Sequence, residues 1–290
     1  MASFYELRWL IRRTIRKLKE KDQKREGLKE DFLLTGDLTV TAEQLPKDEA
    51  FAEYTVVNTE GRHLTYRSFY QWADLYGEYS IFCRHHGCAV CTLTTLARIY
   101  DENQKDATPD TIIEDLEKQV VGQKNWTNNY RKMPMKFQNP ITLYGITQAL
   151  QHMGVKAEYV PHFTDDEARK DILSHLQTGN PVVIEVGRKN YYTGETNNRW
   201  TNSFHTMILI GLTREGKVLV NDSANRSWYE GPQRFKLADL EDLMAYMFSC
   251  TEEPKEYYYC GMATDGGYIK IGQWRFFPGL LLNFLLKVLK

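Results

Sequence analysis

The sequence predicts an α+β fold in which N-terminal helices pack on an antiparallel sheet. Patterns typical of helices fill the chain up to Gly179, and patterns typical of strands dominate from Pro181 onward. Two of the later strands are joined by a tight turn, which makes them antiparallel neighbours. Helices and strands that are segregated along a chain are typical of α+β proteins, whereas regular alternation would predict a parallel sheet.

The N-terminal region combines a basic helix with an irregular segment. Residues 3–30 carry apolar side chains at helical spacing and a cluster of arginines and lysines, which predicts a helix. Residues 31–60 show weak periodicity, and we expect an irregular lead-in there. After the aromatic-rich stretch Tyr70–Tyr79, Gly87 opens a helix that we expect over Cys88–Tyr100.

Capping signals predict three further helices. Thr108-Pro109-Asp110 offers an N-cap, a proline for the first helical position and an acid for the first turn. Asn139-Pro140 repeats this device, and its helix is expected to run to Met153. Thr164 and Glu167 have the spacing of a capping box, at the start of a helix that stops at Gly179.

The C-terminal half contains the expected sheet. Pro181–Val186 reads as a strand, and Thr206–Leu212 is apolar enough to be buried on both faces. A tight turn connects it to Val218–Asp222, which completes a hairpin. We expect a helix over Lys236–Phe248 and a last strand over Tyr268–Trp274.

We therefore divide the chain into three parts: residues 1–64 with the basic helix and lead-in, a main domain at 65–250, and a C-terminal extension at 251–290. The extension ends in the apolar segment Gly279–Lys290, which is too short to span a bilayer. Two roles stay open for the terminal helices. They contact a membrane surface, or they bury their apolar side chains against the protein body or a dimer partner.

Composition narrows the functional classes. The chain has 290 residues with 42% hydrophobic and 26% charged residues, close to the average for globular proteins, so a disordered or fibrous protein is a poor interpretation. The net charge of -1 gives no overall field for nucleic acid, and we expect no nucleic-acid partner.

The cysteines and the N-terminus indicate a compartment. There is no secretory signal pattern, because Glu6 and Arg8 interrupt the first ten residues. The five cysteines are odd in number, and three crowd together between Cys83 and Cys91, which does not resemble a secreted disulfide framework. We therefore expect a reduced, cytoplasmic protein.

Three residues have the chemistry and the order of a thiol-nucleophile site. Cys88 follows Gly87 at the expected start of a helix, where the helix dipole lowers the pKa of a thiol. His205 stands at the mouth of a buried strand, where a rigid imidazole can act as base. Pairing of the two hairpin strands would bring Asp222 beside His205, while alternation points Asn221 to the other face.

Each residue also has an ordinary structural interpretation. A cysteine at a helix start is more often a small buried apolar side chain, and an aspartate between Asn221 and Ser223 is often a turn residue. The joint order of the segments favours the nucleophile. A zinc site built on Cys88 and Cys91 with Cys83 or His85 is a rival, but the usual second ligand pair is missing. We expect neither a metal nor another cofactor.

Five segments resemble the C39-like cysteine peptidases. Gly87–Leu96 is similar to the Gly-Cys-(Gly/Ala)-x-(Thr/Ala)-Ser-Leu segment of that family, and Gly179–Ile184 to its Gly-x-Pro-Val strand. Phe204–Gly211 resembles its His-Phe-Val-Val-Val-x-Gly strand, and Val218–Ser223 its Val-x-Val-Asn-Asp-Pro segment, with Ser223 in place of Pro. Upstream, Gln71–Gly77 resembles the family's Gln…Trp-Ala-x-x-x-Tyr-Gly lead-in.

The resemblance extends over about residues 68–248. It implies a papain-like fold, a Cys88–His205–Asp222 triad and Gln71 as an oxyanion donor, in a stand-alone member of the family. Ser80 and the backbone N–H of Cys88 are further candidates for the oxyanion donor.

The sequence therefore predicts a cysteine peptidase that cleaves a peptide amide through a thioester. Two alternatives stay open: acyl transfer to an amine on the same fold, and a non-catalytic peptide-binding protein on a papain-like scaffold. A peptide or protein is the expected partner in each case.

Overall fold

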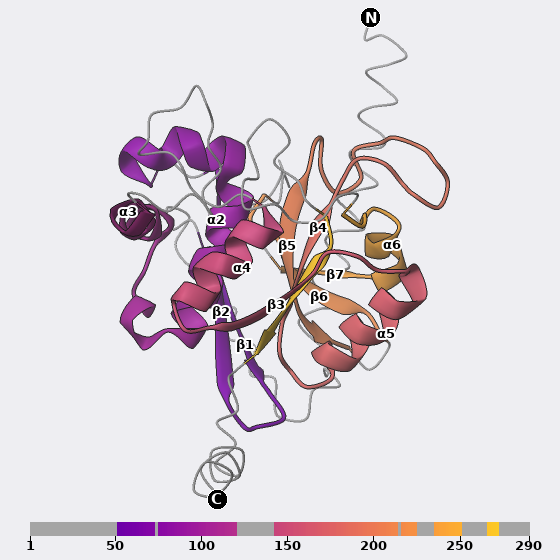
Figure 1. Cartoon of the computed structure of the whole chain (residues 1–290), viewed down its shortest axis with the longest axis horizontal. Helices are drawn as coiled ribbons and strands as arrows, with labels where there is room; N and C mark the ends of the chain where they lie inside the picture. The colour runs from indigo at the N-terminus through magenta and orange to yellow at the C-terminus, as the bar shows by residue number, and fades with distance from the viewer. Residues whose placement is uncertain are drawn as a thin grey trace, which may run out of the picture.

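A six-stranded antiparallel sheet forms the centre of the protein (Figure 1). The computed structural model describes residues 51–72, 75–120, 142–213, 216–224, 235–250 and 266–272. The strands lie in the order β3-β8-β4-β5-β6-β7, and helices cover both faces of the sheet. This arrangement confirms the predicted α+β class of helices on an antiparallel sheet.

The strands of the sheet are short. Their bounds are Lys156–Val160 for β3, Val182–Val186 for β4, His205–Leu212 for β5, Val218–Asn221 for β6, Phe235–Ala238 for β7 and Tyr268–Gly272 for β8. The hairpin β5–β6 was predicted, as were β4 and β8. Strand β3 was not, because this edge strand exposes Lys156 and Glu158 and its pattern resembles a polar loop.

Two segments differ from the prediction. The expected helix over Lys236–Phe248 is replaced by strand β7 and one helical turn, α6 at Leu240–Met244. The edge of β6 offers backbone partners to β7, and this long-range pairing overrides local helical pattern.

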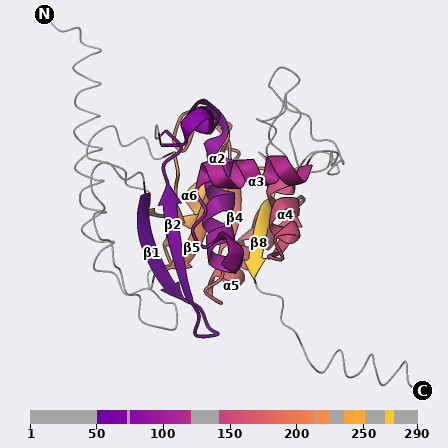
Figure 2. The same ribbon diagram turned by 90° about the vertical axis from the view of Figure 1, so that its left-hand side faces the viewer.

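Residues 31–60 were expected to be irregular, but a hairpin begins there, with β1 at Phe51–Val57 and β2 just beyond at His63–Phe69. Its turn is held by Asn58, whose side-chain oxygen accepts from the amides of Glu60 at 3.0 Å and Arg62 at 2.9 Å. Figure 2 shows the hairpin beside the main sheet, with β2 next to α2.

Helix α2, the longest helix among the described residues, covers Ser80–Tyr100 and begins eight residues before Cys88. The prediction that Gly87 opens this helix is wrong. The apolar face continues upstream through Phe82 and Cys83, which are both buried, so packing extends the helix toward its N-terminus. Gly87 has a different role, because a Cβ on it would lie 2.7 Å from the Cβ of Gln71.

The remaining helices begin at capping residues. Helix α3, at Pro109–Val120, starts at the predicted proline. Helix α4, at Leu143–His152, begins later than predicted: Thr142 is its N-cap and accepts from the Gly145 amide at 3.0 Å, while residues 139–141 lie outside the described part. Helix α5, at Asp165–Leu176, has the predicted capping box of Thr164 and Glu167.

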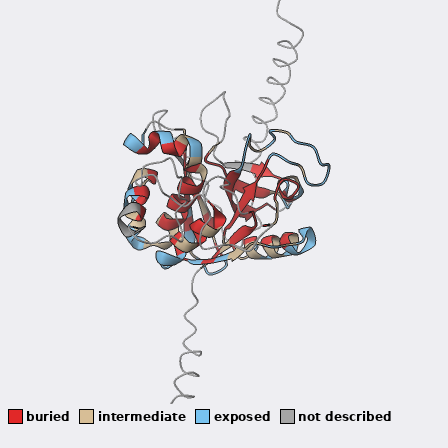
Figure 3. Ribbon diagram, turned by 45° about the horizontal axis from the view of Figure 1, so that its top comes forward, coloured by how far each residue is buried: buried red, intermediate tan, exposed pale blue. Residues whose placement is uncertain are grey.

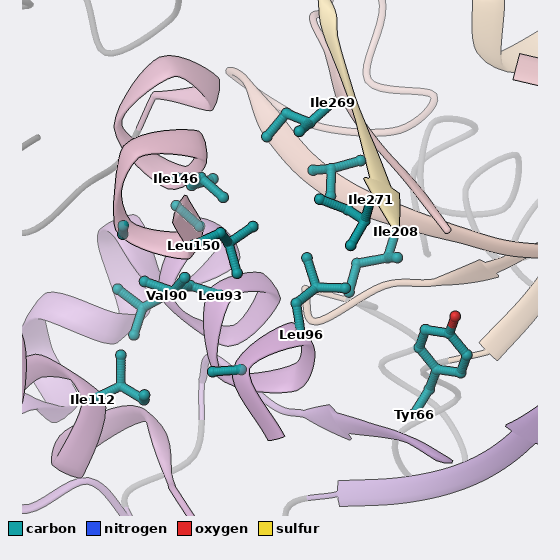
Figure 4. Close-up of a cluster of buried hydrophobic side chains, with 14 of the residues drawn as sticks. Tyr66, Val90, Leu93, Leu96, Ile112, Ile146, Leu150, Ile208, Ile269 and Ile271 are labelled. Atoms are coloured by element: carbon teal, nitrogen blue, oxygen red, sulfur yellow. The ribbon is translucent and has the colours of Figure 1, made fainter. Parts of the chain in front are cut away.

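Buried side chains on the two faces of the sheet form two cores. On one face, Val90 and Leu93 of α2 pack with residues of α4 near Ile208 and Ile269 of the sheet (Figure 4). On the other face, α5 and α6 cover the sheet through an apolar cluster that includes Ile172. Figure 3 shows the resulting buried centre, with exposed residues on the outer helices and loops.

The folded unit extends beyond both predicted boundaries of the main domain, residues 65 and 250. Residue 64 lies inside β2, and β8, from the segment expected to be an extension, lies between β3 and β4. The terminal segments expected to form helices, residues 3–30 and 279–290, lie outside the described residues. In the part of the chain that is described, no helix combines the length and apolarity needed to cross a membrane.

The turn of the β1–β2 hairpin packs closely against Gly179, just after the end of α5. Gly179 has φ +75, and a Cβ on it would lie 2.5 Å from the Cα of Asn58. We expect Gly179→Ala to lower the free energy of unfolding by about 3 kcal/mol, because it combines left-handed strain with this clash.

Gly61→Ala is the matched control: Gly61 has the same φ but no atom within 4 Å. Its loss should be about 1 kcal/mol. Urea denaturation followed by circular dichroism measures both, and equal losses would contradict the steric account.

Candidate active site

Cys88 lies in the third turn of α2, where this helix faces strand β5. Its side chain is half-buried, whereas its neighbours Gly87 and Ala89 are buried. The side chain of His205 and the backbone and hydroxyl groups of Thr206 lie close enough to the thiol to lower its pKa. Thr206 shares a face of β5 with Ile208 and Ile210, which pack in the core with α2, and strand alternation therefore places it toward Cys88.

His205 is the first residue of β5 and is 3% exposed. Its Nε2 atom lies 2.6 Å from Oδ1 of Asp222, which is also buried. Because Asp222 occupies Nε2, Nδ1 is the ring nitrogen left for the contact with Cys88. The imidazole thus stands between a thiol and a carboxylate.

The register of the β5–β6 hairpin explains how Asp222 reaches His205. Asn221, the last residue of β6, pairs with Ile208. Asp222 follows directly, one step closer to the start of β5, and lies diagonally across from His205 on the same face. Oδ1 of Asp222 also accepts from the Ala224 amide at 3.0 Å, which fixes the carboxylate in place. Asn221 shares the face of Ile208, as strand alternation predicts.

Burial and charge act in opposite directions on the thiol. Burial alone would raise the pKa of Cys88, but the hydrogen bond and positive charge of His205, together with the donors of Thr206, lower the pKa below its ordinary value. This environment favours the thiolate.

The imidazole shows the complementary shift. Burial alone would lower the pKa of His205, but the charge and hydrogen bond of Asp222, and then Cys88, raise the pKa to about 9. A lowered thiol pKa next to a raised imidazole pKa favours transfer of the thiol proton to the imidazole, which gives a thiolate–imidazolium pair. That state is a nucleophile with a proton donor beside it.

Gln71 is held against α2 next to Cys88. Its backbone N–H donates to the Ser223 carbonyl at 3.1 Å, and its Oε1 accepts from the Ser223 hydroxyl at 3.2 Å. Its Nε2 donates to the carbonyl of Arg84 at 3.4 Å, one helical turn before Cys88. The absence of a side chain on Gly87 allows this close approach. The structure therefore brings Gln71 to the same place as the three other predicted site residues.

The two other oxyanion candidates do not fit the geometry. Because α2 begins at Ser80, the Cys88 amide lies beyond the first four residues, whose N–H groups have no partner in the helix. Ser80 is two turns away, and its hydroxyl accepts from the Tyr76 amide at 3.2 Å. Neither replaces Gln71 as a donor beside the thiol.

Two of the three cysteines of the rival zinc site lie in the core instead. Cys83 and Cys91 are both buried, and burial, followed by the nearby charge of Asp110, raises the pKa of the Cys83 thiol to about 12. A zinc ligand needs the opposite shift, toward the thiolate. Within the described ranges, no group of three His, Cys, Asp or Glu side chains is placed to hold a metal ion.

Two residues of the site were not identified from the sequence. Thr206 looked like an ordinary strand residue, and the alternation of β5 is the signal that could have placed it toward α2. Ser223 was noted only as a replacement for proline. Its contact with Gln71 joins segments 152 residues apart, and no local pattern carries that information.

Comparison with known proteins gives one family. The sequence model of the Peptidase_C39 like family matches residues 63–246, well over half of the chain. The matched region contains Gln71, Cys88, His205 and Asp222, and its α+β architecture agrees with a papain-like fold. A search of curated proteins found no match.

Replacement of Asp222 by asparagine tests the electrostatics of the site. Asp222→Asn keeps an acceptor for Nε2 but removes the charge that raises the pKa of His205. The imidazolium should then be lost at lower pH, and the thiolate should lose its counter-ion. We expect the alkylation rate of Cys88 by iodoacetamide near pH 6 to fall roughly tenfold.

The alkylation rate is measured against pH, with the modified residue identified by mass spectrometry. Asp242→Asn is the control, because Asp242 is an acid of α6 that pairs with Arg199 outside the site. An unchanged pH profile in Asp222→Asn would contradict the assigned role of the carboxylate.

Proposed function

Because the chain belongs to the Peptidase_C39 like family, we propose that it is a cysteine peptidase that cleaves a peptide amide bond through a thioester intermediate. The observation that carries the proposal is the arrangement of Cys88, His205 and Asp222. A thiol of lowered pKa contacts an imidazole of raised pKa, and that imidazole is bonded to a buried carboxylate. Thiol peptidases need this order of nucleophile, base and orienting acid.

In the first half of the reaction, the Cys88 thiolate attacks the carbonyl carbon of the substrate. A C–S bond forms, and the carbonyl electrons move to oxygen, where an N–H donor stabilises the oxyanion. Collapse breaks the C–N bond, and His205 gives its proton from Nδ1 to the leaving nitrogen. The products of this half are a thioester on Cys88 and a free amine.

In the second half, water attacks the thioester. His205, now neutral, takes a proton from the water at Nδ1, and collapse of the second oxyanion breaks the C–S bond. This step releases the carboxylic acid and restores the thiolate–imidazolium pair. Asp222 holds Nε2 throughout, which keeps Nδ1 directed at the reacting atoms.

Gln71 is proposed as the oxyanion donor. A glutamine amide carries two N–H groups, and the contact with the Arg84 carbonyl uses one of them. That contact is long, at 3.4 Å, so a negatively charged oxygen beside Cys88 would compete for the donor.

The nucleophile requires a free thiol, which supports a reducing compartment, and we propose the cytoplasm. The four cysteines in the described ranges, including Cys88 and Cys250, are free. Cell fractionation followed by immunoblotting tests this proposal, and recovery of the protein only in an oxidising compartment would contradict it.

Removal of the nucleophile tests the proposed activity. The protein is incubated with a library of peptides from a proteome digest, and new termini are identified by mass spectrometry. We expect Cys88→Ala to abolish cleavage, a loss of at least about a thousandfold. Cys250→Ala is the matched control, because this buried cysteine lies outside the site, and its activity should stay within about twofold of wild type.

The products separate the alternatives. New free carboxyl termini indicate hydrolysis, and carboxyl groups joined to an added amine indicate acyl transfer. Cleavage by Cys88→Ala at the wild-type rate would contradict the proposal. A wild-type protein that binds peptides but forms no covalent adduct at Cys88 would instead indicate a binding protein.

A further inference from the structure

Ser223 and Gln71 lie far apart in the sequence but are joined directly in the structure. Two hydrogen bonds link them: the Gln71 backbone N–H to the Ser223 carbonyl at 3.1 Å, and the Ser223 hydroxyl to Gln71 Oε1 at 3.2 Å. Both residues are at least nine-tenths buried. The site therefore contains a buried polar link between the segment before α2 and the end of β6.

The link fixes which way the Gln71 carboxamide faces. The Arg84 carbonyl can only accept, so the end of the carboxamide that faces it is the amino group. The hydroxyl of Ser223 donates to the opposite end, at Oε1. If the carboxamide rotated by half a turn, Oε1 would face the carbonyl of Arg84 and two acceptors would repel each other. The Arg84 carbonyl therefore selects this orientation, and the Ser223 hydroxyl stabilises it by donating to Oε1.

In that orientation the amino group of Gln71 faces the helical turn of α2 that contains Cys88. Arg84 and Cys88 are one helical turn apart on α2. Nε2 uses one hydrogen on the Arg84 carbonyl, and no other acceptor for this group occurs among the described residues. Gly87 lets Gln71 lie directly against this turn, since any Cβ there would collide with it. A donor is thus held beside the thiol with a hydrogen to spare.

From these contacts we propose that Ser223 is a positioning residue, which holds the Gln71 carboxamide with its amino group toward the carbonyl oxygen of a substrate bound at Cys88. The inference rests on the proposed function, because an oxyanion donor matters only if Cys88 attacks a carbonyl. Ser223 acts through Gln71 and touches no reacting atom. Ser223 also follows Asp222 directly, so one short segment orients both the imidazole and the oxyanion donor.

Two reactions at Cys88 distinguish this role from a structural one. Alkylation by iodoacetamide needs the thiolate but forms no oxyanion. Acylation by p-nitrophenyl acetate also needs the thiolate, but it passes through a tetrahedral oxyanion: a C–S bond forms, the ester C–O bond breaks, and the electron pair leaves with p-nitrophenolate. The ratio of the two rates therefore reports oxyanion stabilisation alone.

The experiment compares Ser223→Ala, Ser223→Thr and Gln71→Ala with wild type, with the modified cysteine confirmed by mass spectrometry. We expect Gln71→Ala to slow acylation roughly a hundredfold and Ser223→Ala roughly tenfold, with the alkylation pH profile unchanged in both. Ser223→Thr keeps the hydroxyl and should restore acylation. In the Gln71→Ala background, Ser223→Ala should have no further effect, because its route of action is already removed.

Each contrary outcome has a distinct meaning. Equal ratios of acylation to alkylation in Ser223→Ala and wild type would overturn the inference alone. So would an additive effect of the two substitutions, or a parallel loss of both reactions, since Ser223 would then act through Asp222 or the general fold. If Cys88 of the wild-type protein is alkylated but never acylated, the proposed function fails and this inference fails with it.

Discussion

The buried hydrogen bond between His205 and Asp222 is the constraint on which the rest of the site depends. A buried imidazole by itself resists protonation, and a buried carboxylate by itself resists ionisation. At 2.6 Å each supplies the charge that the other needs, and the pKa of His205 rises to about 9 despite its burial. The imidazolium can then stabilise a thiolate on Cys88. The register of the β5–β6 hairpin sets this distance, so the electrostatics of the site follow from strand pairing.

The position of Cys88 inside α2 changes the source of thiolate stabilisation. A helix start would offer a positive dipole end and unpaired amides, and both effects decline after the first turn. In the third turn they are absent, and His205 and the donors of Thr206 take their place. The same displacement removes the Cys88 amide as an oxyanion donor. The chemistry beside the thiol therefore depends on side chains from other segments, and Gln71 gains importance.

The sequence predicts features that depend on contacts between nearby residues better than features that depend on contacts between distant segments. The hairpin and the approach of Asp222 to His205 depend on a short turn and on alternation, which are local and readable. The start of α2 was misread, because Gly87 looked like a helix boundary and is in fact a contact with Gln71, a residue from a different segment. The insertion of β8 between β3 and β4 depends on long-range pairing, which leaves no local pattern. The family resemblance supplied Gln71 from its motif, but it had no counterpart for the hydroxyl of Ser223.

The contact between Gln71 and Ser223 shows why such departures from a family pattern deserve a structural explanation. A proline at this position would keep the carbonyl that accepts from the Gln71 amide, and it would lack the hydroxyl that reaches Oε1. The backbone bond fixes where Gln71 lies, and the side-chain bond holds its carboxamide in the orientation that the Arg84 carbonyl selects. Only the second is chemically specific, because exchange of Oε1 and Nε2 would reverse the polarity presented to a substrate oxygen. With the serine, the segment that follows β6 bonds the imidazole through Asp222 and the proposed oxyanion donor, Gln71, through the next residue. Cys88, His205 and Gln71 are therefore held by one junction between α2 and the β5–β6 hairpin.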